Sequence, residues 1–191
     1  MKKLLPLLAS VIIGSQALAQ ETGESDGLAL WGQIYEVLSH PRCANCHVGE
    51  DHRPRWSGPS YGLEDGEWRY HGMYIHADES RFGVESIVCS TCHQQKNSPD
   101  PHGPPGAPVW MLPPVEMEWF GKSSAEVCEQ VKDPDRNGGR SLEDVASHID
   151  HDVLVHWGWE PGPGREPAPY TRKDVVAFIN AWAKAGAPCP N

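Results

Sequence analysis

Two pentapeptides decide how this 191-residue chain is organised: Cys43-Ala44-Asn45-Cys46-His47 and Cys89-Ser90-Thr91-Cys92-His93. Each has the form C-x-x-C-H, the signal for covalent attachment of haem c. The two thiols of such a motif add to the two vinyl groups of one porphyrin, and the histidine that follows them reaches the iron. The repeated pattern therefore predicts two haem c groups, with His47 and His93 as the proximal iron ligands.

Other roles are known for cysteines that lie three residues apart. They occur in zinc knuckles, in redox-active dithiols and in structural disulfides. None of these roles accounts for a histidine directly after both pairs. An oxidising compartment, which the N-terminus indicates, also disfavours a zinc site made of thiolates.

The N-terminus has the three regions of a secretory signal peptide. Two lysines precede an apolar run at residues 4–13, and Ala17-Leu18-Ala19 matches a signal-peptidase site. We therefore expect residues 1–19 to be removed on export to the periplasm, leaving residues 20–191 as a single domain. An uncleaved N-terminal anchor is the alternative, but the apolar run is too short to span a bilayer.

Acidic residues outnumber basic ones, and the formal net charge is -10. Removal of the signal peptide would take away two lysines and bring that charge to about -12. An acidic surface disfavours nucleic acid and anionic membranes as partners, and favours a redox protein with a basic docking surface. Solubility alone is the other explanation of the same charge.

Two cysteines, Cys128 and Cys189, lie outside the paired motifs. An even remainder in an exported chain predicts one disulfide, which would tie a mid-chain helix to the C-terminal tail. Two free and buried thiols are the alternative.

The distal side of each iron has several candidate ligands. His71 and Met73 lie between the two motifs, His148 lies in an expected helix beside an apolar stripe, and Met117 follows a proline-rich loop. A second protein ligand would make the iron six-coordinate and suited to electron transfer, whereas an open position would permit binding or catalysis. The alternative for each is a surface or packing role, and for His148 an ion pair with an aspartate one turn away.

Periodicity and capping residues predict a chain that is mostly helical. The expected helices cover residues 26–40, 85–94, 123–131, 141–155 and 171–186. Glycine (19) and proline (18) are abundant between them, and no strand pattern stands out. The predicted fold class is thus mostly α, with cytochrome c-like helices and long Gly/Pro loops wrapped around two covalently bound haems.

Several stretches resemble a known family. They are His40 to His47, Pro105-Gly106-Ala107-Pro108, Lys132-Asp133-Pro134 with Arg136-Asn137-Gly138-Gly139-Arg140, and Trp157-Gly158-Trp159 with Pro161-Gly162-Pro163-Gly164-Arg165. Together they are similar to proteobacterial periplasmic di-haem cytochromes c, often labelled as a subunit of isoquinoline 1-oxidoreductase. The resemblance covers nearly the whole mature chain. It implies a molybdenum hydroxylase as electron donor, and it carries over only the two C-x-x-C-H sets as functional residues.

Electron transfer between a dehydrogenase- or hydroxylase-type donor and a respiratory acceptor is the function that these patterns favour. The sequence contains no Gly-rich nucleotide loop and no nucleophile motif. A di-haem peroxidase-like enzyme, or a haem-based ligand-binding module with one open iron site, is the alternative. Arg140 and Arg165 are candidates to hold haem propionates, because the planar guanidinium can bond both oxygens of a carboxylate.

Overall fold

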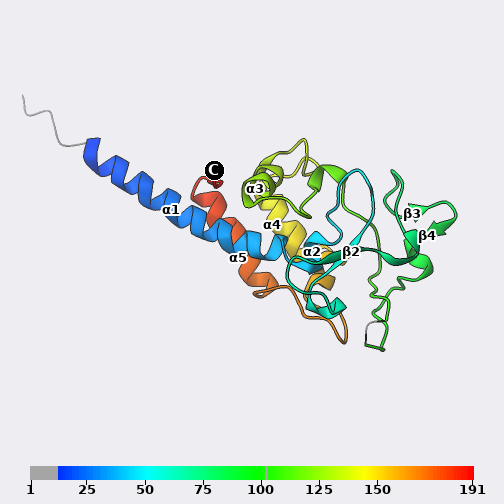
Figure 1. Cartoon of the computed structure of the whole chain (residues 1–191). Coiled ribbons are helices and arrows are strands. Elements are labelled where there is room, and N and C mark those ends of the chain that lie inside the picture. Colours follow the sequence, from blue (N-terminus) through cyan, green and yellow to red (C-terminus); the bar gives the residue numbers. More distant parts are fainter. Residues whose placement is uncertain (1–12, 102) are drawn as a thin grey trace, which may run out of the picture.

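The structure is a computed structural model that describes residues 13–101 and 103–191 (Figure 1). The first twelve residues of the predicted signal peptide lie outside the described residues. Its remainder belongs to the helix α1 (Ile13–Leu38), which begins earlier than the helix expected from residue 26. None of the described helices is long and apolar enough to cross a membrane.

Four helices form one side of the molecule: α1, α3 (Ser124–Lys132), α4 (Leu142–His151) and α5 (Arg172–Lys184). Figure 1 shows α5 beside α1, and α5 also packs against α4. Helices α3, α4 and α5 each begin with a capping box, in which the side chains of the N-cap and N3 residues satisfy each other's backbone N–H groups. The pairs are Ser123 with Glu126, Ser141 with Asp144, and Thr171 with Asp174.

The core of this side is built around two tryptophans. Trp31 of α1 and Trp182 of α5 have ring centroids 4.9 Å apart, and both side chains are buried. Each indole N–H has a partner, since Trp31 donates to Ser124 Oγ at 2.8 Å and Trp182 donates to the carbonyl of Pro188 at 2.9 Å. A large aromatic surface can therefore be buried without leaving a polar atom unsatisfied.

The predicted disulfide is confirmed. Cys128, fully buried in α3, is bonded to Cys189 in the C-terminal tail. The bond closes the chain over 61 positions and fixes the tail against the helical core.

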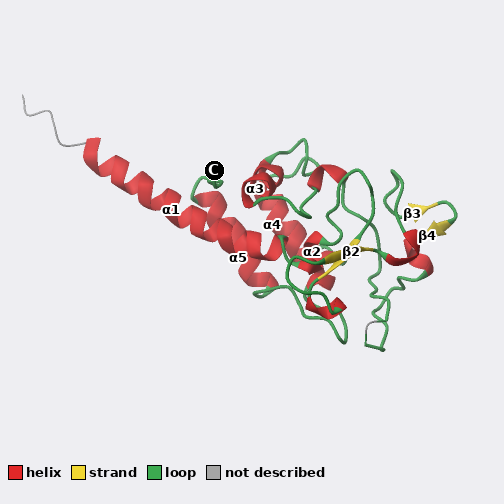
Figure 2. Ribbon diagram, viewed as in Figure 1, coloured by secondary structure: helices red, strands yellow, loops and turns green. Residues whose placement is uncertain are grey.

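Loops and short elements make up the other side of the molecule (Figure 2). Strands β1 (Arg55–Ser57) and β2 (Trp68–Tyr70) pair antiparallel, with Trp56 opposite Arg69. Strands β3 (Gly83–Val84) and β4 (Ile87–Val88) form a second antiparallel pair. The remaining elements are α2 (Pro41–Ala44) and 3-10 turns at Pro59–Tyr61, Gly72–Tyr74, Cys89–Thr91, Val115–Met117 and Val155–Gly158.

The predicted fold class is wrong. Helices account for 40% of the chain, and the arrangement is neither clearly a cytochrome c fold nor plainly that of another class. The physical reason lies between the first motif and α3, where prolines that lack an N–H and flexible glycines prevent continuous helix. Loops and two short strand pairs fill this region in the described part of the chain.

The helix expected at residues 85–94 is also absent. The chain instead forms the β3–β4 hairpin and a single 3-10 turn at the second motif. The β-branched Val84, Ile87 and Val88 favour extended backbone. Gly83 has a φ of 110°, and a Cβ there would meet the carbonyl oxygen of Ile87 at 2.6 Å, so only glycine permits this hairpin.

Candidate functional site

The first C-x-x-C-H motif starts on the short helix α2. Pro41 occupies the first turn, where its missing N–H costs nothing, and the His40 ring accepts a hydrogen bond from the Arg42 backbone at 3.2 Å. This turn places Cys43 and Cys46 on neighbouring positions of one face, with the Cys46 N–H bonded to the Cys43 carbonyl at 3.2 Å.

The His47 ring is fixed by a hydrogen bond from Nδ1, which leaves Nε2 available as a ligand. Its Nδ1 donates to the carbonyl of Met117 at 2.8 Å, and its ring stacks on Trp119 with centroids 3.4 Å apart and planes within 2°. Burial lowers the pKa of His47 to about 3. The imidazole is therefore neutral, and its lone pair is on Nε2, which is the state that ligates iron.

His93 of the second motif has the same arrangement. Its Nδ1 donates to the carbonyl of Pro105 at 2.8 Å, and its ring stacks on Trp110 with centroids 4.3 Å apart and planes within 5°. Burial lowers the pKa of His93 to about 4. The two histidines thus have equivalent surroundings although their flanking sequences differ. In each, Nδ1 donates to a backbone carbonyl and the ring stacks on a tryptophan.

The four motif cysteines form no disulfide among the described residues. Burial raises the pKa of Cys43 to about 12 and that of Cys46 to about 11, so both are protonated thiols. Cys46 and Cys89 line the same cavity, so the two motifs lie near each other in space.

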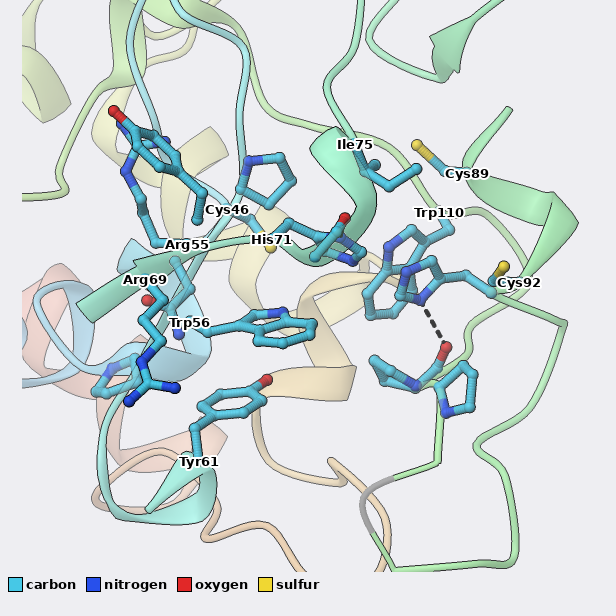
Figure 3. A pocket seen from close by; sticks show the side chains of 18 of the residues that line it. Cys46, Arg55, Trp56, Tyr61, Arg69, His71, Ile75, Cys89, Cys92 and Trp110 are labelled. Atoms are coloured by element: carbon cyan, nitrogen blue, oxygen red, sulfur yellow. Dashed lines mark hydrogen bonds between the residues drawn. The ribbon is translucent and has the colours of Figure 1, made fainter. Parts of the chain in front are cut away.

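A cavity of about 790 Å³ joins the two motifs. This volume falls within the range of about 300–1,000 Å³ that is typical of cofactor and ligand sites. Its wall contains Cys46 from the first motif and Cys89, Cys92 and His93 from the second. The rest combines prolines and aliphatic side chains with aromatic and cationic ones, among them Trp56, Tyr61, Trp110, Trp157, Arg42, Arg55, Arg69 and Arg165. Figure 3 shows Cys89 and Cys92 beside Trp110, with Trp56 and Tyr61 facing them across the cavity.

The cavity residues fit a haem. Thiols and a neutral histidine share its wall, and flat apolar side chains suit a porphyrin face. The Nε atoms of Arg55 and Arg165 are buried without a hydrogen-bond partner in the described structure. The other guanidinium nitrogens are hydrogen-bonded to Asp51 and a backbone carbonyl in Arg55, and to two backbone carbonyls in Arg165. Each arginine therefore has one donor, Nε, left for a haem propionate. Arg140, the other propionate candidate, lines a separate, shallower hollow beside His148.

No group of three or more His, Cys, Asp or Glu side chains converges as a metal site within the described residues. A haem iron does not require one, because the porphyrin supplies four ligands and the protein only one or two.

Of the distal candidates, the two histidines lie near the motif histidines. The His71 ring lines the cavity, 6.1 Å from the His93 ring between centroids. His148 is among the groups that lower the pKa of His47, and its Nδ1 lies 3.5 Å from Asp152 Oδ2, one turn further along α4.

The two methionine candidates are placed differently. Met73 lies at the cavity mouth but is 77% exposed. Met117 is packed against the helical core, and its carbonyl holds the Nδ1 side of His47, away from Nε2.

Asn45 is a site residue that the sequence analysis missed. It lies inside the first motif, yet its side chain pairs with the β1 strand: Ser57 Oγ donates to Asn45 Oδ1 at 2.7 Å, and Asn45 Nδ2 donates to the Ser57 carbonyl at 3.4 Å. The Arg55 N–H also donates to the Asn45 carbonyl at 2.8 Å. The first motif and the β1–β2 hairpin are therefore one hydrogen-bonded unit.

Replacing Asn45 by alanine should lower the free energy of unfolding by about 2 kcal/mol, because the hydroxyl and the carbonyl of the half-buried Ser57 lose their hydrogen bonds. Chemical denaturation followed by circular dichroism measures this. Ser57→Ala is the matched variant, and the double variant should lose less than the sum of the two single losses. Strictly additive losses would show that the two side chains do not interact.

Trp110, Trp119 and Arg55 were also missed as site residues. No local sequence pattern indicates that these tryptophans contact the motif histidines, because only the folding of the loops brings them together.

Comparisons with protein families, with curated proteins and with solved structures found no match for this chain.

Proposed function

We propose that this chain is a periplasmic electron-transfer protein that carries two covalently attached haem c groups. The observation that carries the proposal is the shared environment of His47 and His93. Each has Nδ1 bonded to a backbone carbonyl at 2.8 Å and its ring stacked on a tryptophan, which leaves Nε2 for an iron. The carbonyl bond also sets the ring orientation and increases the basicity of Nε2.

The cysteines would supply the covalent attachment. Each thiol S–H bond would break, sulfur would bond to one vinyl carbon and hydrogen to the other, so that no net oxidation or reduction occurs. Cys43 and Cys46 would hold one haem, and Cys89 and Cys92 the other. Thiols that are free of disulfide bonds, as all four are, are what this addition needs.

The position of the two motifs supports electron exchange between them. When bound, a haem iron cycles between the ferric and ferrous states and so accepts and releases single electrons. Cys46 of the first motif shares a cavity wall with Cys89 and Cys92 of the second. Two haems attached at these positions would share one cavity, close enough to exchange electrons with each other.

The acidic surface suits a redox partner with a basic docking surface. We propose a dehydrogenase- or hydroxylase-type donor and a respiratory acceptor, with a molybdenum hydroxylase as the first donor to test. Export of the chain after cleavage at residue 19 would place it with such periplasmic partners.

The number of haems per chain tests the proposal directly. Expressed in a bacterium that matures c-type cytochromes, the purified protein should carry two covalently bound haems by intact mass and by pyridine haemochrome absorbance. Cys43→Ser with Cys46→Ser should remove one haem, and Cys89→Ser with Cys92→Ser should remove the other.

The control is Cys128→Ala with Cys189→Ala, which changes the same number of cysteines outside the motifs and should keep both haems. A wild-type protein without covalent haem in this host would refute the proposal.

A further inference from the structure

We infer that His71 is the distal iron ligand opposite His93, so that the second haem is bound by two histidines. The inference rests on the proposed attachment of a haem at Cys89 and Cys92. It adds an iron ligand that lies far from either C-x-x-C-H motif along the chain.

The separation of the two rings is the first argument. A metal–nitrogen distance of about 2.0 Å, plus about 1.1 Å from that nitrogen to the ring centre, places two axial imidazole centroids roughly 6 Å apart. The His71 and His93 centroids are 6.1 Å apart, with an angle of 57° between the ring planes. The two rings are thus spaced for one iron between them.

The hydrogen bonds of the two rings are the second argument. His71 Nδ1 lies 3.1 Å from the carbonyl of Gly72, and His93 Nδ1 lies 2.8 Å from the carbonyl of Pro105. A carbonyl accepts only from a protonated nitrogen, so both rings carry their proton on Nδ1. In the neutral imidazole the lone pair is then on Nε2, and neither Nε2 atom has a hydrogen-bond partner among the described residues.

The third argument is that the hairpin holds His71 in place. His71 follows β2 directly, and its backbone N–H donates to the carbonyl of Pro54, next to β1, at 2.9 Å. Trp56 packs against the His71 ring with centroids 5.2 Å apart, and Tyr61 stacks on Trp56. Figure 3 shows His71 between Trp56 and Trp110. A ligand fixed in this way loses little conformational entropy when it binds.

The residues after His71 run along the mouth of the cavity. A Cβ at Gly72 would lie 3.3 Å from the Trp56 ring, so a small residue is needed there. Met73 and Tyr74 then adopt left-handed backbone, with φ of 57° and 58°, and their side chains are 77% and 83% exposed. The turn thus leaves most of the Met73 side chain in solvent at the cavity mouth, whereas the His71 ring lies beside His93, which favours His71 over Met73 as the ligand.

Substitution of His71 tests the inference, with His76→Ala as the matched control, since His76 lies in the same loop with an exposed side chain. Haem content is measured first, by intact mass, for every variant. In His71→Ala with two haems attached, one of the two irons should become high-spin in EPR spectra and bind CO. His76→Ala should leave both spectra unchanged.

Two further measurements guard against indirect effects. Added imidazole should restore the low-spin signal of His71→Ala, and His71→Met should keep that iron low-spin but produce a sulfur-to-iron charge-transfer band. A two-haem His71→Ala protein with an unchanged spin state and no CO binding would overturn the inference alone. A wild-type chain without covalent haem would instead overturn the proposed function.

Discussion

Replacing Trp182 by alanine should lower the free energy of unfolding by about 4 kcal/mol, since a buried Trp-to-Ala change typically costs about 3–5 kcal/mol. Trp182 is 0% exposed and packs against Trp31, where α5 meets α1. The truncation leaves a cavity between two helices and also leaves the Pro188 carbonyl without its donor. Denaturant unfolding of the purified protein, followed by far-ultraviolet circular dichroism, measures the loss.

Val153→Ala is the control for this substitution, because Val153 is 47% exposed and surface changes usually stay within about 0.5 kcal/mol. Similar losses for the two variants would mean that the tryptophan pair is not the centre of the helical core. The haem content should stay at two in both variants, since neither side chain lines the cavity between the motifs.

Removing the disulfide, with Cys128→Ala and Cys189→Ala together, should cost about 4 kcal/mol, because a cross-link over some sixty residues restricts the unfolded chain by about that amount. The sequence separation of the two cysteines is 61. Alanine is chosen because a serine hydroxyl would be left unsatisfied at the buried Cys128.

Reduction of the wild-type protein provides an independent comparison. Unfolding in excess reductant should move to the same denaturant midpoint as the double alanine variant, and reductant should not affect the variant itself. An unchanged midpoint for the variant would show that the C-terminal tail is held by other contacts, such as the Trp182 bond to Pro188.

Elements with strong local signals were predicted well from the sequence. Ser123, Ser141 and Thr171 each precede an acidic residue at N3, and all three start a helix at the expected place. Each capping box involves only four consecutive residues, so the same residues give the signal and make the interaction. The disulfide was equally predictable, because two cysteines were left over in a chain that we expected to be exported.

The strand pairs were not predictable in the same way. Strands β1 and β2 have three residues each, too few to show an alternating pattern against their surroundings. Their pairing depends on Ser57 meeting Asn45, a contact between positions that no local rule connects. In the second motif, helical spacing was expected from the two cysteines, but a hairpin and one 3-10 turn satisfy that spacing as well.

In the candidate site, too, features set by consecutive residues were predictable and features set by distant contacts were not. The spacing of cysteines and histidines indicates attachment chemistry, because that chemistry acts within five consecutive residues. The acceptors on the histidines are the backbone carbonyls of Met117 and Pro105, and every residue has such a carbonyl. The conformation of the loops decides which carbonyl lies next to each histidine Nδ1, so the sequence alone does not identify the acceptor.

The double role of Asn45 has a consequence for how such a chain can diverge. The two residues between the paired cysteines take no part in haem attachment, so substitutions there would ordinarily be tolerated. Here Asn45 is hydrogen-bonded to the β1–β2 hairpin, and His71, beside the second motif, directly follows that hairpin. The two C-x-x-C-H motifs are therefore not structurally independent. A substitution at Asn45 would change the position of His71 on the other side of the cavity, unless a second substitution at Ser57 restored the hydrogen bonds.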